Sequence, residues 1–276
     1  MVASMSGADA PIAIFDSGVG GLTVAAAIAR VLPEEPLVYL GDTARLPYGT
    51  KSAETVTRYA VQATKTLMRF RPKMIVVACN TASAVALPVL VAAYAPIPVV
   101  GVVEPGARAA VAASQNGSIA VIATEGTVRG GAYARAIRAL KPDAQVVQRA
   151  CPLFVALAEE GWTEGQVPDL AAAQYLKDMF SGDAQPDTLV LGCTHFPVLV
   201  GAIRKAVGPG VALVDSAETI AREIASLLKS PEHSSPGRRR HVFLSTDAPD
   251  RFARVGSQFL GAKIDVDQVE LVDLAS

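Results

Sequence analysis

The sequence predicts an α/β protein made of two similar open parallel-sheet domains, related by a pseudo-two-fold axis, with the active site in the cleft between them. Short aliphatic segments typical of buried strands alternate with helical segments along most of the 276 residues. Two strand-to-loop segments, 75–81 and 189–195, also read like copies of each other. Each has an aliphatic run, a small residue, a cysteine and two residues with hydrogen-bonding side chains, so one copy is expected in each domain.

In the first half, we expect strands at residues 12–15, 37–40, 74–78 and 98–102. Helices are expected over 22–32, 52–70 and 82–93. The first of these is rich in alanine and ends before Pro33, because proline cannot continue a helix. The hydroxyl of Ser52 can cap the second helix.

The second half repeats the alternation, so we expect a second sheet. Strands are expected at 118–122, 145–148, 188–191 and 212–214, with helices over 130–140, 152–160, 198–207 and 217–228. A polar loop at 230–240 precedes a last strand at 242–245 and a helix near 251–259. The expected division is a discontinuous first domain of residues 1–100 and 212–276, with residues 101–211 forming the second.

The charge pattern argues against several classes of partner. The net charge is −1, so no overall field favours nucleic acid or an anionic membrane. The basic cluster Arg238–Arg240 lies beside serine and proline residues and is interpreted as a solvated loop. The uncharged stretch 84–103 is the one candidate membrane span, but Pro88, Pro96 and Pro98 interrupt it.

A cytoplasmic location is expected. The first 29 residues contain no lysine or arginine, so residues 1–10 lack the charged start of a secretory signal and are interpreted as a loose terminus. The three cysteines are widely spaced and do not form a disulfide framework. We therefore expect all three thiols to be reduced.

Cys79 and Cys193 are the main candidates for chemistry. Both follow predicted strands, and ligands of open α/β sheets bind beyond the carboxyl ends of the strands. Both also precede helices, whose N-terminal N–H groups can lower the pKa of a thiol or bind a carboxylate. Two thiols presented in matching segments suggest two acid/base groups that face one substrate from opposite sides. Cys151 has no matching segment and is expected to be structural.

Asp16 follows the first strand, in a glycine-rich loop that is not a nucleotide loop. Thr23 stands where a dinucleotide motif has its third glycine, and a Walker lysine is missing. A carboxylate here suits contact with a substrate ammonium group or the orientation of a thiol, and a helix-capping role is the simpler alternative.

His195 lies two residues after Cys193 and could either tune that thiol or ligate a metal together with Cys79. A zinc site needs further ligands at short spacing, and the sequence does not offer them, so no metal is expected. His233 and His241 lie in or beside the late polar loop and are expected to be exposed. The other candidate contacts at strand ends are Tyr48, Gly49, Asn80, Thr81, Thr124 and Thr194.

Five motifs in fixed order resemble those of the glutamate racemases. They are Asp-Ser-Gly-Val-Gly-Gly-Leu at 16–22, Tyr-Leu-Gly-Asp-Thr-Ala at 39–44, Pro-Tyr-Gly at 47–49, Ala-Cys-Asn-Thr-Ala-Ser at 78–83 and Gly-Cys-Thr-His-Phe-Pro at 192–197. The resemblance runs from about residue 11 to residue 260. It implies two α/β domains, a cofactor-independent activity that supplies D-glutamate for peptidoglycan, and a homodimer.

The resemblance also implies residue roles. Cys79 and Cys193 would be the acid/base pair, with Asp16 serving Cys79, and Glu159 with His195 serving Cys193. Glu160 is an adjacent competitor of Glu159 for the acidic position. The expected substrate contacts are Asp16, Ser17, Tyr48, Gly49, Asn80, Thr81, Thr124, Thr194 and His195. One departure is Ala156, which stands where relatives often have proline.

Three other activities stay open at this point. A related two-cysteine racemase would act on aspartate or a hydantoin. A Cys-His hydrolase would use Cys193 as nucleophile and His195 as base, which leaves Cys79 without a role. A non-catalytic module would bind glutamate without changing its chirality.

Overall fold

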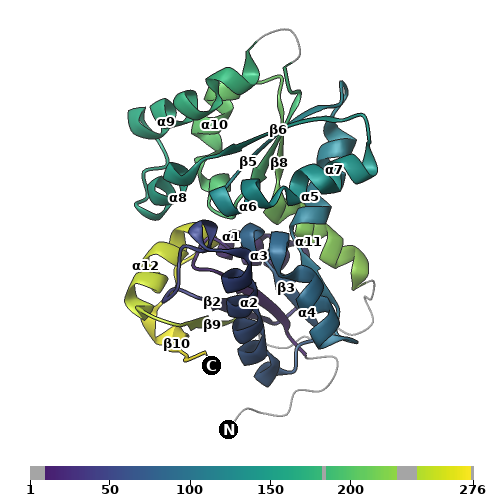
Figure 1. The fold of residues 1–276 in the computed structure, drawn as a ribbon. Helices are drawn as coiled ribbons and strands as arrows, with labels where there is room; N and C mark the ends of the chain where they lie inside the picture. The colour runs from purple at the N-terminus through teal and green to yellow at the C-terminus, as the bar shows by residue number, and fades with distance from the viewer. Residues whose placement is uncertain (1–9, 182–184, 229–240, 275–276) are drawn as a thin grey trace.

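The chain forms two parallel sheets that lie in separate halves of the molecule (Figure 1). The computed structural model describes residues 10–181, 185–228 and 241–274. The six-stranded sheet has the order β10-β9-β2-β1-β3-β4, and the four-stranded sheet has the order β6-β5-β7-β8. All strand pairs are parallel. The predicted fold class is therefore confirmed.

The first sheet is built from both ends of the chain. Its strands are β1 (Ile12–Asp16), β2 (Leu37–Gly41), β3 (Met74–Val77), β4 (Val99–Gly101), β9 (Val242–Ser245) and β10 (Val269–Leu271). Its helices are α1 (Leu22–Val31), α2 (Ala53–Leu67), α3 (Asn80–Val85), α4 (Leu87–Tyr94) and α12 (Pro249–Leu260). Ser52 caps α2 as predicted, because its side chain accepts a hydrogen bond from the Thr55 N–H.

The second sheet contains β5 (Ser118–Ala123), β6 (Gln145–Ala150), β7 (Thr188–Gly192) and β8 (Ala212–Asp215). Its helices are α5 (Val103–Ala113), α6 (Glu125–Gly130), α7 (Ala132–Leu140), α8 (Pro152–Glu159), α9 (Gln166–Leu176) and α10 (Val200–Val207), whereas α11 (Ser216–Leu227) follows β8 and packs mainly against α1 of the first half. The expected boundary at residue 212 needs a correction at this strand. Strand β8 pairs with β7, so it completes the second sheet and does not return to the first.

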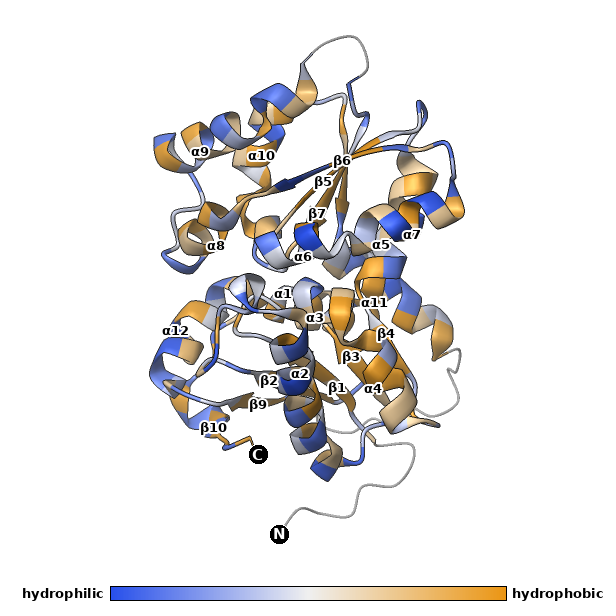
Figure 2. Cartoon of the chain, in the orientation of Figure 1, coloured by the Kyte–Doolittle hydropathy of each residue, from blue (hydrophilic) through white to orange (hydrophobic). Residues whose placement is uncertain are grey.

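Each sheet is covered on both faces, which explains the nearly continuous aliphatic strands. In β1, Ile12 and Ile14 pack with α1 and α12, whereas Ala13 and Phe15 pack on the opposite face with α2 and α3. Figure 2 shows hydrophobic inner strands and helices with mixed outer surfaces, whereas the edge strand β6 also carries hydrophilic residues. The hydrophobic core is thus a layer on each side of each sheet.

Four consecutive strands follow one order in both sheets. The order β2-β1-β3-β4 in the first sheet corresponds to β6-β5-β7-β8 in the second. Strand β3 therefore corresponds to β7, and each is followed by one of the two candidate cysteines. This repeat brings Cys79 and Cys193 to equivalent places in the two halves.

Some elements differ from the expectation. The predicted helix 82–93 is two helices, α3 and α4, separated at Ala86, with Pro88 in the first turn of α4. Helix α5 and the edge strand β10 were not predicted. None of the helices in the described ranges is long and apolar enough to cross a membrane. The expectations for residues 1–9, His233 and the Arg238–Arg240 cluster lie outside the described residues.

Candidate active site

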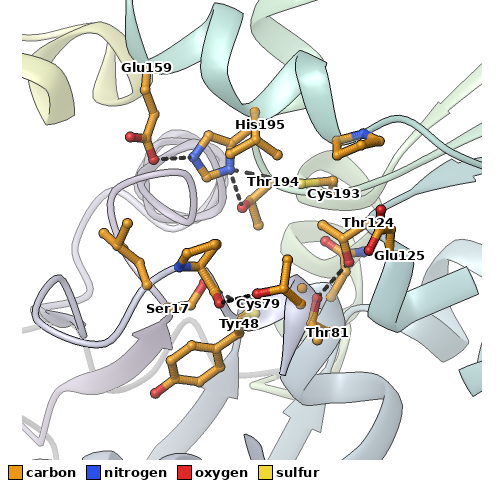
Figure 3. A pocket seen from close by; sticks show the side chains of 18 of the residues that line it. Ser17, Tyr48, Cys79, Thr81, Thr124, Glu125, Glu159, Cys193, Thr194 and His195 are labelled. Carbon is orange, nitrogen blue, oxygen red and sulfur yellow. Dashed lines mark hydrogen bonds and ion pairs between the residues drawn. The ribbon is translucent and has the colours of Figure 1, made fainter. Parts of the chain in front are cut away.

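A cavity of about 300 Å³ lies between the two halves, beyond the carboxyl ends of both sheets. Cys79 reaches it from the first half and Cys193 from the second (Figure 3). Both cysteines are 5% exposed. The other predicted residues that line the cavity are Ser17, Tyr48, Gly49, Asn80, Thr81, Thr124, Glu159, Thr194 and His195.

Cys79 lies between strand β3 and helix α3 and caps the N-terminus of α3. Its Sγ accepts a hydrogen bond from the Ala82 N–H at 3.5 Å and donates one to Ser17 Oγ at 3.4 Å. Burial, with a smaller contribution from the charge of Asp16, raises the pKa of Cys79 to about 12. Cys79 is therefore a protonated thiol at neutral pH.

Asp16 is fully buried and lies behind the cavity wall. Its Oδ2 accepts a hydrogen bond from the Gly18 N–H at 3.0 Å, and its Oδ1 has no partner within the described part of the chain. Burial raises the pKa of this carboxyl group. Asp16 is not among the lining residues, whereas its neighbours Ser17 and Gly18 are. This placement favours an electrostatic role beside Cys79 over direct contact with a substrate ammonium group.

Cys193 begins a chain of polar groups that crosses to the other half of the molecule. Its Sγ lies 3.9 Å from His195 Nδ1, and His195 Nε2 lies 3.1 Å from Glu159 Oε1. The Arg251 guanidinium then donates a hydrogen bond to Glu159 Oε2 at 2.7 Å. Glu159 belongs to α8 of the second half and Arg251 to α12 of the first half, so these hydrogen-bonded side chains connect the two halves.

The pKa values of Glu159 and His195 favour the charged forms of both side chains. Burial opposes the charge on Glu159, but the hydrogen bonds from His195 and Arg251 outweigh it and lower the pKa of Glu159 to about 2. Burial likewise opposes the imidazolium, yet the hydrogen bonds to Cys193 and Glu159 raise the pKa of His195 to about 10. A cationic His195 therefore lies beside the Sγ of Cys193.

The Pro-Tyr-Gly loop is fixed by a buried carboxylate. The Tyr48 hydroxyl donates a hydrogen bond to Asp42 Oδ2, which also accepts one from Arg45 Nε at 2.7 Å. At Gly49, an added Cβ would lie 2.7 Å from the Cβ of Thr124. The loop therefore lies directly against the second half, and this close approach requires glycine.

Hydroxyl and amide groups complete the wall. Thr81 Oγ1 and Thr124 Oγ1 are 2.8 Å apart across the two halves. Thr124 also caps α6 by accepting a hydrogen bond from the Thr127 N–H. The lining includes no lysine or arginine among the described residues, so neutral donors and His195 are the groups available to an anionic ligand.

Several site residues were not predicted. Arg251 lies 92 residues after its partner Glu159, and no local motif marks it. Leu46, Thr50, Val155 and Glu125 also line the cavity. Cys151 is fully buried. His241 was expected to be exposed but is partly buried. Among the described residues, no group of three or more His, Cys, Asp and Glu side chains could hold a metal ion.

The chain is similar to known proteins in both sequence and fold. The family model described as Asp/Glu/Hydantoin racemase matches residues 22–224. The glutamate racemase of Geobacter metallireducens is 53% identical, over 94% of this chain and 96% of its own. That of Syntrophus aciditrophicus is 45% identical, over 95% of this chain and 97% of its own.

Solved structures agree over nearly the full length. The RacE1 glutamate racemase of Bacillus anthracis has a TM-score of 0.89 at 38% identity, covering 96% of this chain and 98% of its own. The Francisella tularensis glutamate racemase, solved in complex with D-glutamate, has a TM-score of 0.88 at 35% identity, with 97% and 98% covered. With a family match over most of its length and two cysteines lining one cavity, this chain belongs to the Asp/Glu/Hydantoin racemase family.

Proposed function

We propose that this protein is a glutamate racemase that interconverts L- and D-glutamate with two cysteine thiols and no cofactor. The observation that carries the proposal is the pair Cys79 and Cys193, which line one cavity from topologically equivalent positions in the two halves. The close relatives that are glutamate racemases support the choice of reaction.

Racemisation removes the α-proton from one face of the substrate and returns a proton to the other face. One thiolate takes the α-proton and leaves a carbanion, and the opposite thiol donates its proton to that carbon. In one direction of the proposed reaction, Cys193 beside the cationic His195 acts as the base, and Cys79, a protonated thiol, acts as the acid. For the other enantiomer the two cysteines exchange roles.

The neutral donors of the wall suit an α-carboxylate that gains negative charge in the transition state. Asn80, Thr81 and Thr194 flank the cysteines, and hydrogen-bond donors fixed in a water-poor cavity stabilise developing charge strongly. Ser17 and the Tyr48–Gly49 loop offer further contacts to the amino group and the second carboxylate. In this proposal, Asp16 acts on Cys79 through its charge, while Glu159 fixes His195 next to Cys193.

Glutamate is favoured over aspartate by the pattern of similarity. Relatives that are 45–53% identical over nearly the whole chain are glutamate racemases. Structures of glutamate racemases hold D-glutamate in one case and L-glutamate in another. The structural likeness to an aspartate racemase of Picrophilus torridus, at 15% identity, shows the fold alone.

We further propose a cytoplasmic homodimer whose D-glutamate enters peptidoglycan, and a first domain made of residues 1–100 with the segment after strand β8. The family resemblance supports the pathway and the dimer. Sedimentation of the purified protein tests the dimer.

The direct test of function is racemisation by the purified protein without pyridoxal phosphate. L-Glutamate and D-glutamate should each lose optical activity and reach the same endpoint, and turnover of aspartate should be at least about a hundredfold slower in kcat/KM. Binding of glutamate without any optical change, or faster turnover of aspartate, would contradict the proposal.

A Cys-His hydrolase is the second candidate, because Cys193, His195 and Glu159 are aligned as nucleophile, base and orienting carboxylate. The position of Cys79 counts against it, since a hydrolase leaves this second cysteine of the same cavity without a role. Mass spectrometry after mixing with activated esters distinguishes the two: the hydrolase predicts a turnover-dependent acyl group on Cys193, and the racemase does not.

A further inference from the structure

Tyr133 contacts the segments that carry both cysteines, although it lies outside the cavity lining. It is the second residue of α7 and is fully buried. Its hydroxyl accepts a hydrogen bond of 2.8 Å from Asn80 Nδ2, and Asn80 directly follows Cys79. This bond joins a helix of the second half to the first cysteine segment.

The ring of the same tyrosine contacts the second cysteine segment. An added Cβ at Gly192, the residue before Cys193, would lie 3.0 Å from Tyr133 Cε2. An added Cβ at Gly106 in α5 would lie 3.1 Å from Cε1, on the other edge of the ring. The two glycines thus form a fitted slot, which fixes the position of the hydroxyl group.

Asn80 depends on this bond for its orientation. The side chain is 2% exposed and lines the cavity, and its Oδ1 has no hydrogen-bond partner within the described part of the chain. The hydroxyl of Tyr133 is therefore the side-chain partner that the structure gives to this amide. Without the hydroxyl, the amide could rotate about its terminal torsion, which is broad for asparagine.

We propose that Tyr133 is a positioning residue of the racemase: it orients the Asn80 amide toward the substrate and holds the Cys79 and Cys193 segments in register across the cavity. The inference rests on the proposed function. Two-base proton transfer needs both sulfur atoms in line with the same carbon, and errors of about 1 Å in such geometry cost about a hundredfold in rate. A buried tyrosine fixed between two glycines limits such errors.

The test variant is Tyr133→Phe, which keeps the ring in its slot and removes the hydroxyl group. We expect kcat/KM for glutamate to fall about tenfold, the usual effect of losing one buried hydrogen bond. The primary isotope effect with 2-deuterioglutamate should increase, because proton transfer limits the rate more strongly. A smaller fraction of folded enzyme would not change that isotope effect. Tyr94→Phe, which removes a hydroxyl bonded to the Val61 carbonyl away from the cavity, is the matched control and should leave both values unchanged.

A double-mutant cycle with Asn80→Ala tests whether Tyr133 acts through the amide. Removal of the Tyr133 hydroxyl in the Asn80→Ala background should change kcat/KM by less than about twofold. An unchanged isotope effect in Tyr133→Phe, or a full tenfold additional loss in the double variant, would overturn the proposal. Absence of racemisation by the wild-type protein would instead overturn the proposed function.

Discussion

The two halves of the molecule share the order of four consecutive strands, yet they surround their cysteines with different groups. Cys79 contacts a hydroxyl group and a backbone N–H, and the nearby carboxyl group of Asp16 is buried, with burial outweighing the charge of His195. Cys193 contacts His195, which leads to Glu159 and Arg251 in a chain of alternating charge. The fold thus repeats the place of the thiol but not its electrostatic environment.

The two supporting carboxyl groups express this difference most clearly. Burial raises the pKa of Asp16, whereas bonds to His195 and Arg251 overcome burial and lower that of Glu159 to about 2. Titratable groups whose pKa values are driven apart indicate different acid/base assignments. We conclude that charge is disfavoured on the carboxyl group beside Cys79 and favoured on the carboxyl group that supports His195.

Removing either thiol should have the largest effect on activity. Cys79→Ser and Cys193→Ser should each lower kcat by about a thousandfold, because a serine hydroxyl is too weak an acid to replace a catalytic thiol. Cys151→Ala is the matched control, since Cys151 is buried outside the cavity, and its kcat should change less than about threefold. Full activity of either serine variant would contradict the two-thiol mechanism.

Glu159→Gln tests whether the charged surroundings of Cys193 depend on Glu159. The neutral amide keeps the shape of the side chain but removes the charge that favours a protonated His195, so the pKa of His195 should fall from about 10. We expect kcat/KM to fall about ten- to a hundredfold and its alkaline limit to move to lower pH. NMR titration of the imidazole and the pH–rate profile measure both effects. A His195 pKa that stays near 10 would show that Glu159 does not support it.

The same ion pair should appear in the pH dependence of stability. The pKa of Glu159 falls from 4.5 to about 2 on folding, so its stabilisation is complete above pH 4.5 and is lost as the pH falls toward 2. The pKa of His195 rises from 6.5 to about 10, so its stabilisation is complete below pH 6.5 and is lost as the pH rises through 10.

Counted once for the pair, through Glu159, this stabilisation is about 3 kcal/mol. Urea unfolding between pH 5 and pH 3 should therefore show a larger loss of stability in the wild type than in Glu159→Gln. Equal slopes for the two proteins over this range would contradict the assigned pairing.

Arg251→Ala should have the smallest effect. The Arg251 side chain is 41% exposed, so water screens its charge, and Glu159 keeps its bond to His195. A loss of about threefold or less in kcat/KM is expected. Arg69→Ala removes a comparable exposed pair with Glu270 and should leave activity unchanged. A hundredfold loss in Arg251→Ala would mean that Arg251, and not His195, is the main partner that positions Glu159.

Most of the fold could be predicted because it is encoded locally. Aliphatic strands covered on both faces and a capping serine need only neighbouring residues to be identified. Helix α5 escaped prediction because Pro105 and Gly106 look like breakers, although proline is tolerated in a first helical turn. Strand β10 is short and mostly exposed, so it lacks the apolar pattern of the buried strands.

The candidate site could be predicted where a motif carries it, as for Cys79 and Cys193. Arg251 and Tyr133 could not be found in this way, because each meets its partner across the two halves of the fold. The depth of Asp16 also depends on tertiary packing: an added Cβ at Gly21 would lie 2.5 Å from the Cβ of Asp16. Local sequence predicts a carboxylate at the strand end but not its separation from the cavity.

The transfer of hydrogen in deuterated water tests the central claim most directly, namely that two thiols act from opposite faces. L-Glutamate should be converted in D₂O and examined by NMR and chiral separation at low conversion. The account predicts that the D-glutamate formed carries deuterium at Cα, because its proton comes from the second cysteine, while the remaining L-glutamate keeps its original hydrogen. D-Glutamate that retains the original α-hydrogen would show a single base acting on both faces and would contradict the account.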